Sequence, residues 1–180
     1  MNETQDGAAR FKLKIIVAGL LASLAAVAVV LFLYFSLVCP CDRTPGAYLF
    51  GDVVAEEITD WSFSNDVPLC QIQVWAGIRP HAVNLNCMAT PQGELFLSCG
   101  NCDNKYWARQ VGDNEQGRLR LNGTVYPVAI KRVTDPRVLD QAWDARAAKL
   151  QVHAAADNPA PAPGSRRGEG WGSFQLVSLR

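Results

Sequence analysis

The sequence lacks the features that mark several common functional classes. Its 17 basic residues are matched by 17 acidic residues, so no excess of positive charge predicts a nucleic-acid partner. It has only two histidines, His81 and His153, and no G-x-S-x-G elbow, which argues against a hydrolase site. A structural zinc site commonly uses two close thiolate pairs, and Cys99 and Cys102 have no second Cys-x-x-Cys pair to accompany them. We therefore predict no metal site.

What the chain does have is one long uncharged run, residues 15–38. Its roughly two dozen apolar residues are enough to cross a hydrocarbon core about 30 Å thick. Arg10, Lys12 and Lys14 precede the run, whereas Arg43 is the only basic residue close behind it. The positive-inside rule then predicts a single-pass anchor in the inner (plasma) membrane, with residues 1–14 in the cytoplasm and the rest extracytoplasmic or periplasmic.

A cleaved signal peptide is the competing interpretation of this run. Its apolar region is normally about 7 to 15 residues long and ends at a small-x-small site, so the run is too long for it. A lipoprotein site at Cys39 is also disfavoured, because the bulky Leu37 and Val38 precede the cysteine.

Export changes how the six cysteines are interpreted, because thiols in an oxidising compartment are expected to form disulfides. Six cysteines allow fifteen complete pairings, and the sequence selects none of them. The candidates are Cys39, Cys41, Cys70, Cys87, Cys99 and Cys102. The first two lie in a predicted stem, residues 39–44, where an intermolecular bridge, a thiol metal site and two incidental thiols all stay open.

Residues 45–150 have the composition of a mainly β (α+β) domain, with short apolar stretches separated by Gly, Pro and Asn. Strands are expected from the following sequence stretches: GAYLFGDVV, EEITDWSF, CQIQVWAGI, PHAVNLNCMAT and GELFLSC. Asn122-Gly123 between alternating apolar residues predicts a tight hairpin.

Two helices are also expected in this domain. KYWARQVGD predicts a short helix that is capped by Asp103 or Asn104. The segment that starts at Asp135-Pro136 predicts a longer helix packed on the sheet. Residues 151–180 are rich in Ala, Pro and Gly and are expected to form a flexible tail with a short apolar end, SFQLVSLR, that could add to a sheet edge or to a partner.

The stretch from Gly93 to Pro136 resembles that of the flavin-binding split-barrel proteins, the pyridoxamine-phosphate-oxidase-like and deazaflavin-dependent reductase-like group. The resemblance implies a six-stranded split β-barrel with one or two flanking helices. It further implies that two barrels form a homodimer and bind FMN or a related flavin or deazaflavin. The residues that it assigns to the cofactor are Lys105, Asn104, Ser98 and Trp107.

Some residues depart from the family pattern. Asp103 lies where a serine or threonine is usual, and a carboxylate there would repel a phosphate. QVGDNEQG replaces the usual N-L-x-x-N-P run, and core packing is an alternative role for Trp107.

Three hypotheses follow for function. The first is a membrane-anchored, flavin-dependent oxidoreductase that acts on a small molecule. The second is a cofactor-free split barrel that serves as a scaffold or as a partner-binding subunit of a membrane complex. The third is thiol-disulfide exchange at Cys99 and Cys102, although the sequence does not place this pair directly at the start of a helix, where the thiol pKa would fall.

Overall fold

The computed structural model describes residues 3–37, 40, 44–113 and 115–180, with side chains omitted for 3–11 and 36–37. Cys39 and Cys41 lie outside the described residues, so their role in the predicted stem stays a prediction. The chain divides into two compact units, Met1–Leu37 and Val38–Arg180, which are described separately below.

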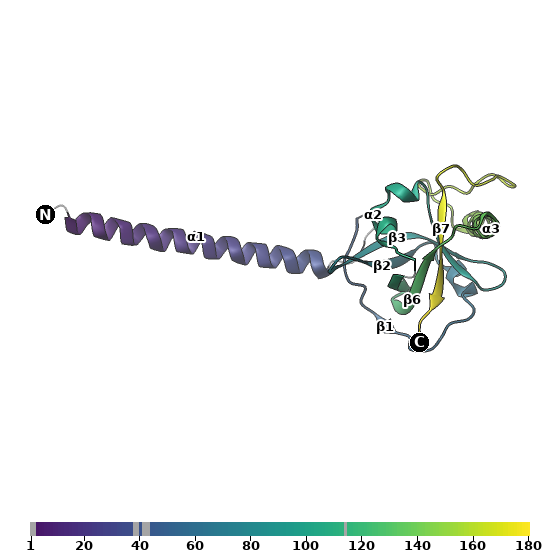
Figure 1. Cartoon of the computed structure of the whole chain (residues 1–180), viewed down its shortest axis with the longest axis horizontal. Coiled ribbons are helices and arrows are strands. Elements are labelled where there is room, and N and C mark those ends of the chain that lie inside the picture. The colour runs from purple at the N-terminus through teal and green to yellow at the C-terminus, as the bar shows by residue number, and fades with distance from the viewer. Residues whose placement is uncertain (1–2, 38–39, 41–43, 114) are drawn as a thin grey trace. The chain divides into compact units, whose positions relative to one another are not determined.

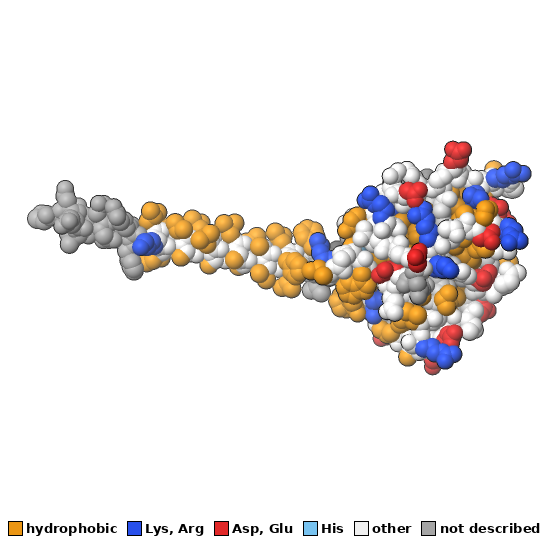
Figure 2. All heavy atoms as spheres, viewed as in Figure 1, with side chains coloured by type: hydrophobic (Ala, Val, Ile, Leu, Met, Phe, Trp, Pro, Cys, Tyr) orange, Lys and Arg blue, Asp and Glu red, His pale blue; other side chains and the backbone are white. Residues whose placement is uncertain are grey.

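The first unit is a single helix, α1 (Glu3–Leu37). Its stretch Lys12–Phe35 has a mean hydropathy of 2.9, and none of it is buried within the protein. Apolar side chains cover α1 along this stretch (Figure 2). A helix satisfies its backbone hydrogen bonds internally, as a lipid environment requires. By length and composition α1 could cross a membrane as an anchor or serve as a signal sequence.

The second unit contains a closed antiparallel barrel of six strands in the described part of the chain. The strands are β2 (Cys70–Ala76), β3 (Arg79–Ala89), β4 (Leu95–Cys99), β5 (Glu115–Leu121), β6 (Thr124–Arg132) and β7 (Gly172–Ser178). Their order is β6-β5-β2-β3-β4-β7, and the pairing of β7 with β6 closes the ring. A short strand, β1 (Asp52–Val53), adds to β6 in parallel. The predicted six-stranded split barrel is confirmed.

Local sequence signals explain two of the elements. Asn122 and Gly123 have φ angles of 47° and 86°, as the tight turn between β5 and β6 requires. Helix α3 (Pro136–His153) begins after Asp135, whose side chain accepts a hydrogen bond from the backbone N–H of Arg137. The predicted hairpin and the predicted helix start are both confirmed.

Two stretches that were expected to be strands differ from the prediction. Residues 56–63 form no strand, and a 3₁₀ helix, η1 (Ser62–Asp66), begins within them. Asp60 accepts hydrogen bonds from the backbone N–H and the hydroxyl of Ser62, and this local turn competes with strand pairing. In the stretch GAYLFGDVV, residues 46–54, only β1 and an isolated bridge between Gly46 and Ala82 form β-type pairings.

The largest difference lies in the segment that was expected to be a flexible tail. Within residues 151–180, β7 forms a barrel strand between β4 and β6, and Figure 1 shows it in yellow beside α3. Phe174 and Leu176 of β7 are buried. The alternative that the apolar end adds to the sheet is the one the structure has, because these apolar residues find partners that are distant in the sequence. The barrel domain therefore extends past residue 150 to Ser178.

Apolar side chains pack in two places. The main core fills the barrel, with Ile72, Leu97, Leu119 and Ile130 among its fully buried members. A second, smaller cluster lies between the sheet and α3 and consists of Met88, Phe96, Ala142 and Ala145. A short helix, α2 (Tyr106–Gln110), follows the loop after β4 and contributes Trp107 to the main core. Two flanking helices, as expected, therefore accompany the described part of the barrel.

Candidate functional site

The loop after β4 is closed by a disulfide between Cys99 and Cys102, with an S–S distance of 2.06 Å. Asn101 between them has a left-handed φ of 52°, and a short 3₁₀ helix, η2 (Cys102–Asn104), follows. Cys102 is buried, and a Cβ atom added to Gly172 of β7 would lie only 2.8 Å from its sulfur. The glycine therefore lets the disulfide pack directly against the start of β7.

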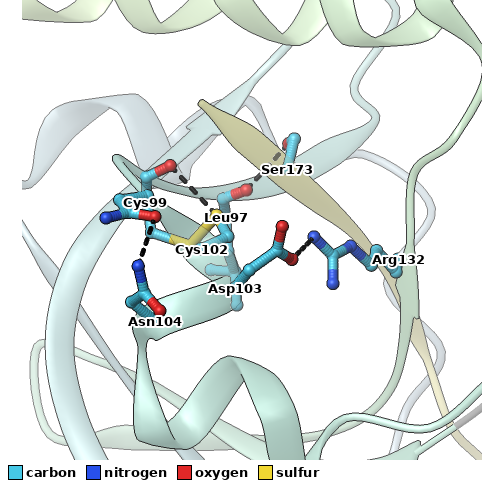
Figure 3. The surroundings of a disulfide bond; sticks show 8 residues. Leu97, Cys99, Cys102, Asp103, Asn104, Arg132 and Ser173 are labelled. Atoms are coloured by element: carbon cyan, nitrogen blue, oxygen red, sulfur yellow. Dashed lines mark hydrogen bonds and ion pairs between the residues drawn. A yellow bond between two sulfur atoms is a disulfide. The ribbon is translucent and has the colours of Figure 1, made fainter. Parts of the chain in front are cut away.

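Asp103 does not cap the following helix as predicted. Its carboxylate instead accepts a hydrogen bond from the guanidinium of Arg132, the last residue of β6, in a charge pair that Figure 3 shows. Helix α2 has Lys105 at its N-cap, without a side-chain cap, because η2 intervenes between Asp103 and the helix. The positive charge of Arg132 therefore compensates the Asp103 carboxylate, which was expected to repel a phosphate.

Two of the four sequence-predicted cofactor residues lie on the outside of this loop. Lys105 is exposed, and its ammonium has no hydrogen bond or ion pair to any residue that the structure describes. Asn104 is also exposed, and its side-chain amide donates to Asn101 Oδ1 over 2.9 Å (Figure 3). The loop thus presents one available cation and one amide that is already engaged.

The other two predicted residues lie in the interior. Ser98 is 4% exposed in β4, and its hydroxyl has no hydrogen-bond partner within the described residues. Trp107 is buried, and its ring centre lies 5.0 Å from that of Phe174 in β7. The structure therefore separates the four residues into an exposed pair on the loop and a buried pair beneath it.

A second polar group, which sequence reasoning missed, lies under α3. The ammonium of Lys149 is 2.7 Å from the carbonyl oxygen of Ser64 and 2.5 Å from that of Cys87, and it is 3.8 Å from Cys87 Sγ. Lys149 is only 5% exposed. Its spacing from Ala142 and Ala145 places it on the buried face of the helix, and that periodicity is the signal that could have found it.

The thiols near Lys149 are perturbed in opposite directions. Burial raises the pKa of Cys70 well above its usual value, and the neighbouring Cys87 raises it further. Burial also acts to raise the pKa of Cys87, but hydrogen bonding from Cys70 and the charge of Lys149 outweigh it and lower that pKa. Both cysteines are buried and free, so neither of these disulfide candidates is bridged in this state.

Two cavities lie against α3 in the described part of the chain. The larger of these two, about 620 Å³ in volume, lies between α3 and the end of β3. Lys149, Ala145, Asn65 and Ala89 are among the residues that line it. A second cavity, about 560 Å³, lies against the other side of α3 near Trp143. Neither of these two cavities includes any of the four predicted cofactor residues.

The ring of six antiparallel strands defines the class of fold as a split barrel. No family model matches the chain, and no curated protein matches it. Among solved structures, the chain is similar to a Listeria innocua protein assigned as a pyridoxamine 5′-phosphate oxidase, with a TM-score of 0.46 and 9% identity over 66% of this chain and 89% of the other. A likeness at this level carries no conclusion about activity.

Proposed function

We propose that the chain is a membrane-anchored, extracytoplasmic split-barrel protein that binds a phosphate-bearing flavin and acts as an oxidoreductase on a small molecule. In this proposal α1 is an uncleaved single-pass anchor, with its N-terminus in the cytoplasm. FMN is the favoured cofactor, and a related flavin or deazaflavin is the alternative cofactor in the same proposal. The observation that carries the proposal is the available ammonium of Lys105 on a loop whose only described carboxylate, that of Asp103, is already paired with Arg132.

The donors on this loop suit a phosphate better than they suit a flavin ring. Lys105 supplies a full positive charge, and the Asp103–Arg132 pair leaves no unbalanced negative charge beside it. Ser98 has an unsatisfied hydroxyl, but it is buried. Trp107 is in contact with Phe174 and is therefore engaged in the core rather than free to stack on a ligand.

A flavin ring would therefore need a second surface, and a homodimer of barrels would supply it. When bound, the cofactor would supply two-electron redox chemistry. Lys105 would hold the phosphate, the disulfide-closed loop would position Lys105, and the partner barrel would cover the flavin ring.

The burial of Trp107 favours a second candidate function, a cofactor-free barrel that acts as a scaffold or as a partner subunit in a membrane complex. Thiol-disulfide exchange at Cys99 and Cys102 is a third candidate. The bridge between these residues supplies the oxidised form that such exchange needs, but burial of Cys102 hinders attack on its sulfur.

Flavin binding can be tested on the full chain in detergent micelles. The absorption spectrum after purification reports bound flavin, and fluorescence titration with FMN and with riboflavin isolates the contribution of the phosphate. We expect Lys105→Ala to weaken FMN binding about tenfold, as the loss of one charge-assisted hydrogen bond would. Riboflavin binding should change little.

Lys131→Ala is the matched control, because Lys131 is an exposed lysine of β6 that is not assigned to the site. Equal FMN affinity for Lys105→Ala and for the unsubstituted chain would contradict the phosphate assignment. A chain that carries no flavin and takes up none would favour the scaffold instead.

The anchor needs its own experiment. Full-length protein in membranes should resist extraction by alkaline carbonate, and protease added from the cytoplasmic side should leave the barrel intact. Release of a shorter soluble form, with α1 removed, would establish a signal sequence in its place.

A further inference from the structure

The group under α3 combines a buried amine with two buried thiols. Burying a lysine ammonium without an opposite charge is costly, because the protein interior solvates it poorly. In the residues that the structure describes, no carboxylate contacts Lys149, and its neighbours are the two carbonyl oxygens and Cys87 Sγ. The thiol of Cys87 is thus the group within reach that can supply the compensating negative charge.

The second thiol lies on the neighbouring strand. Cys70 of β2 is paired in register with Leu85 of β3, so Cys87, two residues further on, faces the same side of the sheet. The pKa of Cys70 is raised and that of Cys87 is lowered, so Cys87 is the more readily ionised of the two thiols. An ionised thiol next to a protonated one is the arrangement in which a reactive cysteine has a resolving partner.

A small molecule has a route toward this group. Lys149 and Ala89 both line the cavity of about 620 Å³, and Lys149 also bonds to Cys87. The lysine side chain therefore lies between open space and the thiol. Cys87 itself is fully buried and does not line the cavity, so the proposal below requires the Lys149 side chain to move aside before a molecule of the size of hydrogen peroxide reaches the sulfur.

We propose that Cys87 is a modification site for small hydroperoxides, that Lys149 positions it as a thiolate, and that Cys70 is its resolving thiol. The site is separate from the disulfide-closed loop and does not depend on flavin binding.

The chemistry balances in two steps. The thiolate of Cys87 attacks one peroxide oxygen, the O–O bond breaks, and the departing hydroxide takes a proton to form water, which leaves Cys87 as a sulfenic acid. The sulfur of Cys70 then attacks the sulfenyl sulfur, and its proton leaves with the hydroxyl group as a second water. Two thiols are oxidised to one disulfide while one hydroperoxide is reduced. Because the two residues are diagonal neighbours on their strands, the second step needs a local shift of the sheet.

The first test is the pH dependence of oxidation in the full-length protein. We would add hydrogen peroxide and follow the masses of the peptides that contain Cys70 and Cys87, which separates them from Cys39 and Cys41. The rate should be nearly constant between about pH 6 and pH 8, whereas an ordinary thiol would react about tenfold faster for each unit of pH in that range. A rate that rises tenfold per unit would overturn the thiolate assignment.

The products provide the second test. The unsubstituted chain should lose two hydrogens in a bridge between the Cys70 and Cys87 peptides. In the Cys70→Ser variant, Cys87 should instead gain one oxygen, as a sulfenic acid that dimedone traps. In the Cys87→Ser variant, Cys70 should stay reduced over the same time. A persistent oxygen adduct on Cys87 in the unsubstituted chain, or a crosslink from Cys87 to Lys149, would overturn the role of Cys70. If Cys70 and Cys87 both stay reduced under conditions that fully oxidise a free-thiol reference compound, the whole proposal is overturned.

Lys149 needs a readout that a purely structural role would not move. Lys149→Met should slow oxidation of Cys87 at about pH 7 by tenfold or more, because an ordinary thiol is ionised to only a few per cent there. It should also restore a steep pH dependence of the rate. If Lys149→Met is folded and reacts as fast as the unsubstituted chain with a flat pH profile, the lysine does not position the thiolate. Should that variant fail to fold, the pH profile of the unsubstituted chain still decides the assignment.

Discussion

Because β7 closes the barrel, truncating its buried side chains should lower the free energy of unfolding strongly, whereas truncating its exposed ones should not. Phe174 is fully buried, its ring is in tilted contact with that of Trp107, and it lies across from Leu97 in the pairing with β4. Replacing a buried phenylalanine by alanine typically costs about 3 to 5 kcal/mol, from lost apolar burial and the cavity left behind. Val177 of the same strand is 56% exposed, so Val177→Ala should cost no more than about 0.5 kcal/mol.

Urea unfolding of both variants in the same detergent, followed by tryptophan fluorescence, measures the difference. With a slope of about 2 kcal/mol per molar urea, Phe174→Ala should lower the midpoint by about 2 M, and Val177→Ala should barely move it. If the two variants unfold at the same concentration as the unsubstituted chain, β7 contributes no core and the barrel is open between β4 and β6. A midpoint lowered equally by both variants would also refute the reasoning, because it would mean that exposure along β7 does not alternate as described.

Three further predictions concern local features of the barrel unit. Asp135→Ala should cost about 1 kcal/mol in urea unfolding, because it removes the cap of α3, and Asp135→Asn should restore most of that. Gly93→Ala should lower the thermal midpoint, because Gly93 has a φ of 80° and its new Cβ would lie 2.7 Å from Asp60 Oδ1; an unchanged midpoint would contradict this geometry. Hydrogen bonds from Ser62 lower the pKa of Asp60 below its ordinary value, so the stabilising effect of the carboxylate is present above that ordinary pKa and is lost as pH falls through the folded-state pKa. Asp60→Asn should remove this part of the acid dependence.

The parts of the fold that sequence predicts well depend on short-range rules. The turn at Asn122-Gly123 needs two consecutive positive φ angles, which few residue pairs adopt easily. The start of α3 needs a side-chain acceptor before a proline, and Asp135-Pro136 supplies both. Neither signal depends on any residue far along the chain.

The strands that were wrong or missed depend on partners. Residues 56–63 have apolar content, but a side-chain turn at Asp60 satisfies the local backbone first. The alternation in β7 is visible in the sequence, but whether such a strand is a barrel member or a free end is decided by β4 and β6, which lie far away in the chain. The sequence therefore could not choose between a free end and an added strand.

The same distinction applies to the candidate sites. Cys99 and Cys102 were among the six disulfide candidates, but the sequence did not select their pairing, which the structure shows as a local bridge. The compensation of Asp103 by Arg132 could not be predicted, because it joins the loop after β4 to the end of β6. The contact of Lys149 with Cys87 joins α3 to β3 in the same way: helical periodicity can place the lysine on the buried face of α3, but it cannot place it beside this thiol.

These long-range contacts make the candidate loop depend on the closing strand. Ser173 of β7 donates a hydrogen bond to the carbonyl of Leu97 in β4 (Figure 3). Gly172 at the start of β7 leaves room for the disulfide, and Phe174 supports Trp107 of α2. Arg132 lies over the ring of Phe174 while it pairs with Asp103. Removing β7 would therefore remove a packing contact of the disulfide, a hydrogen bond to β4 and a ring contact of α2. Lys105, on which the proposed phosphate site depends, lies between Cys102 and Trp107, and both of these residues pack against a strand that the sequence left open as a free end or an addition to a sheet.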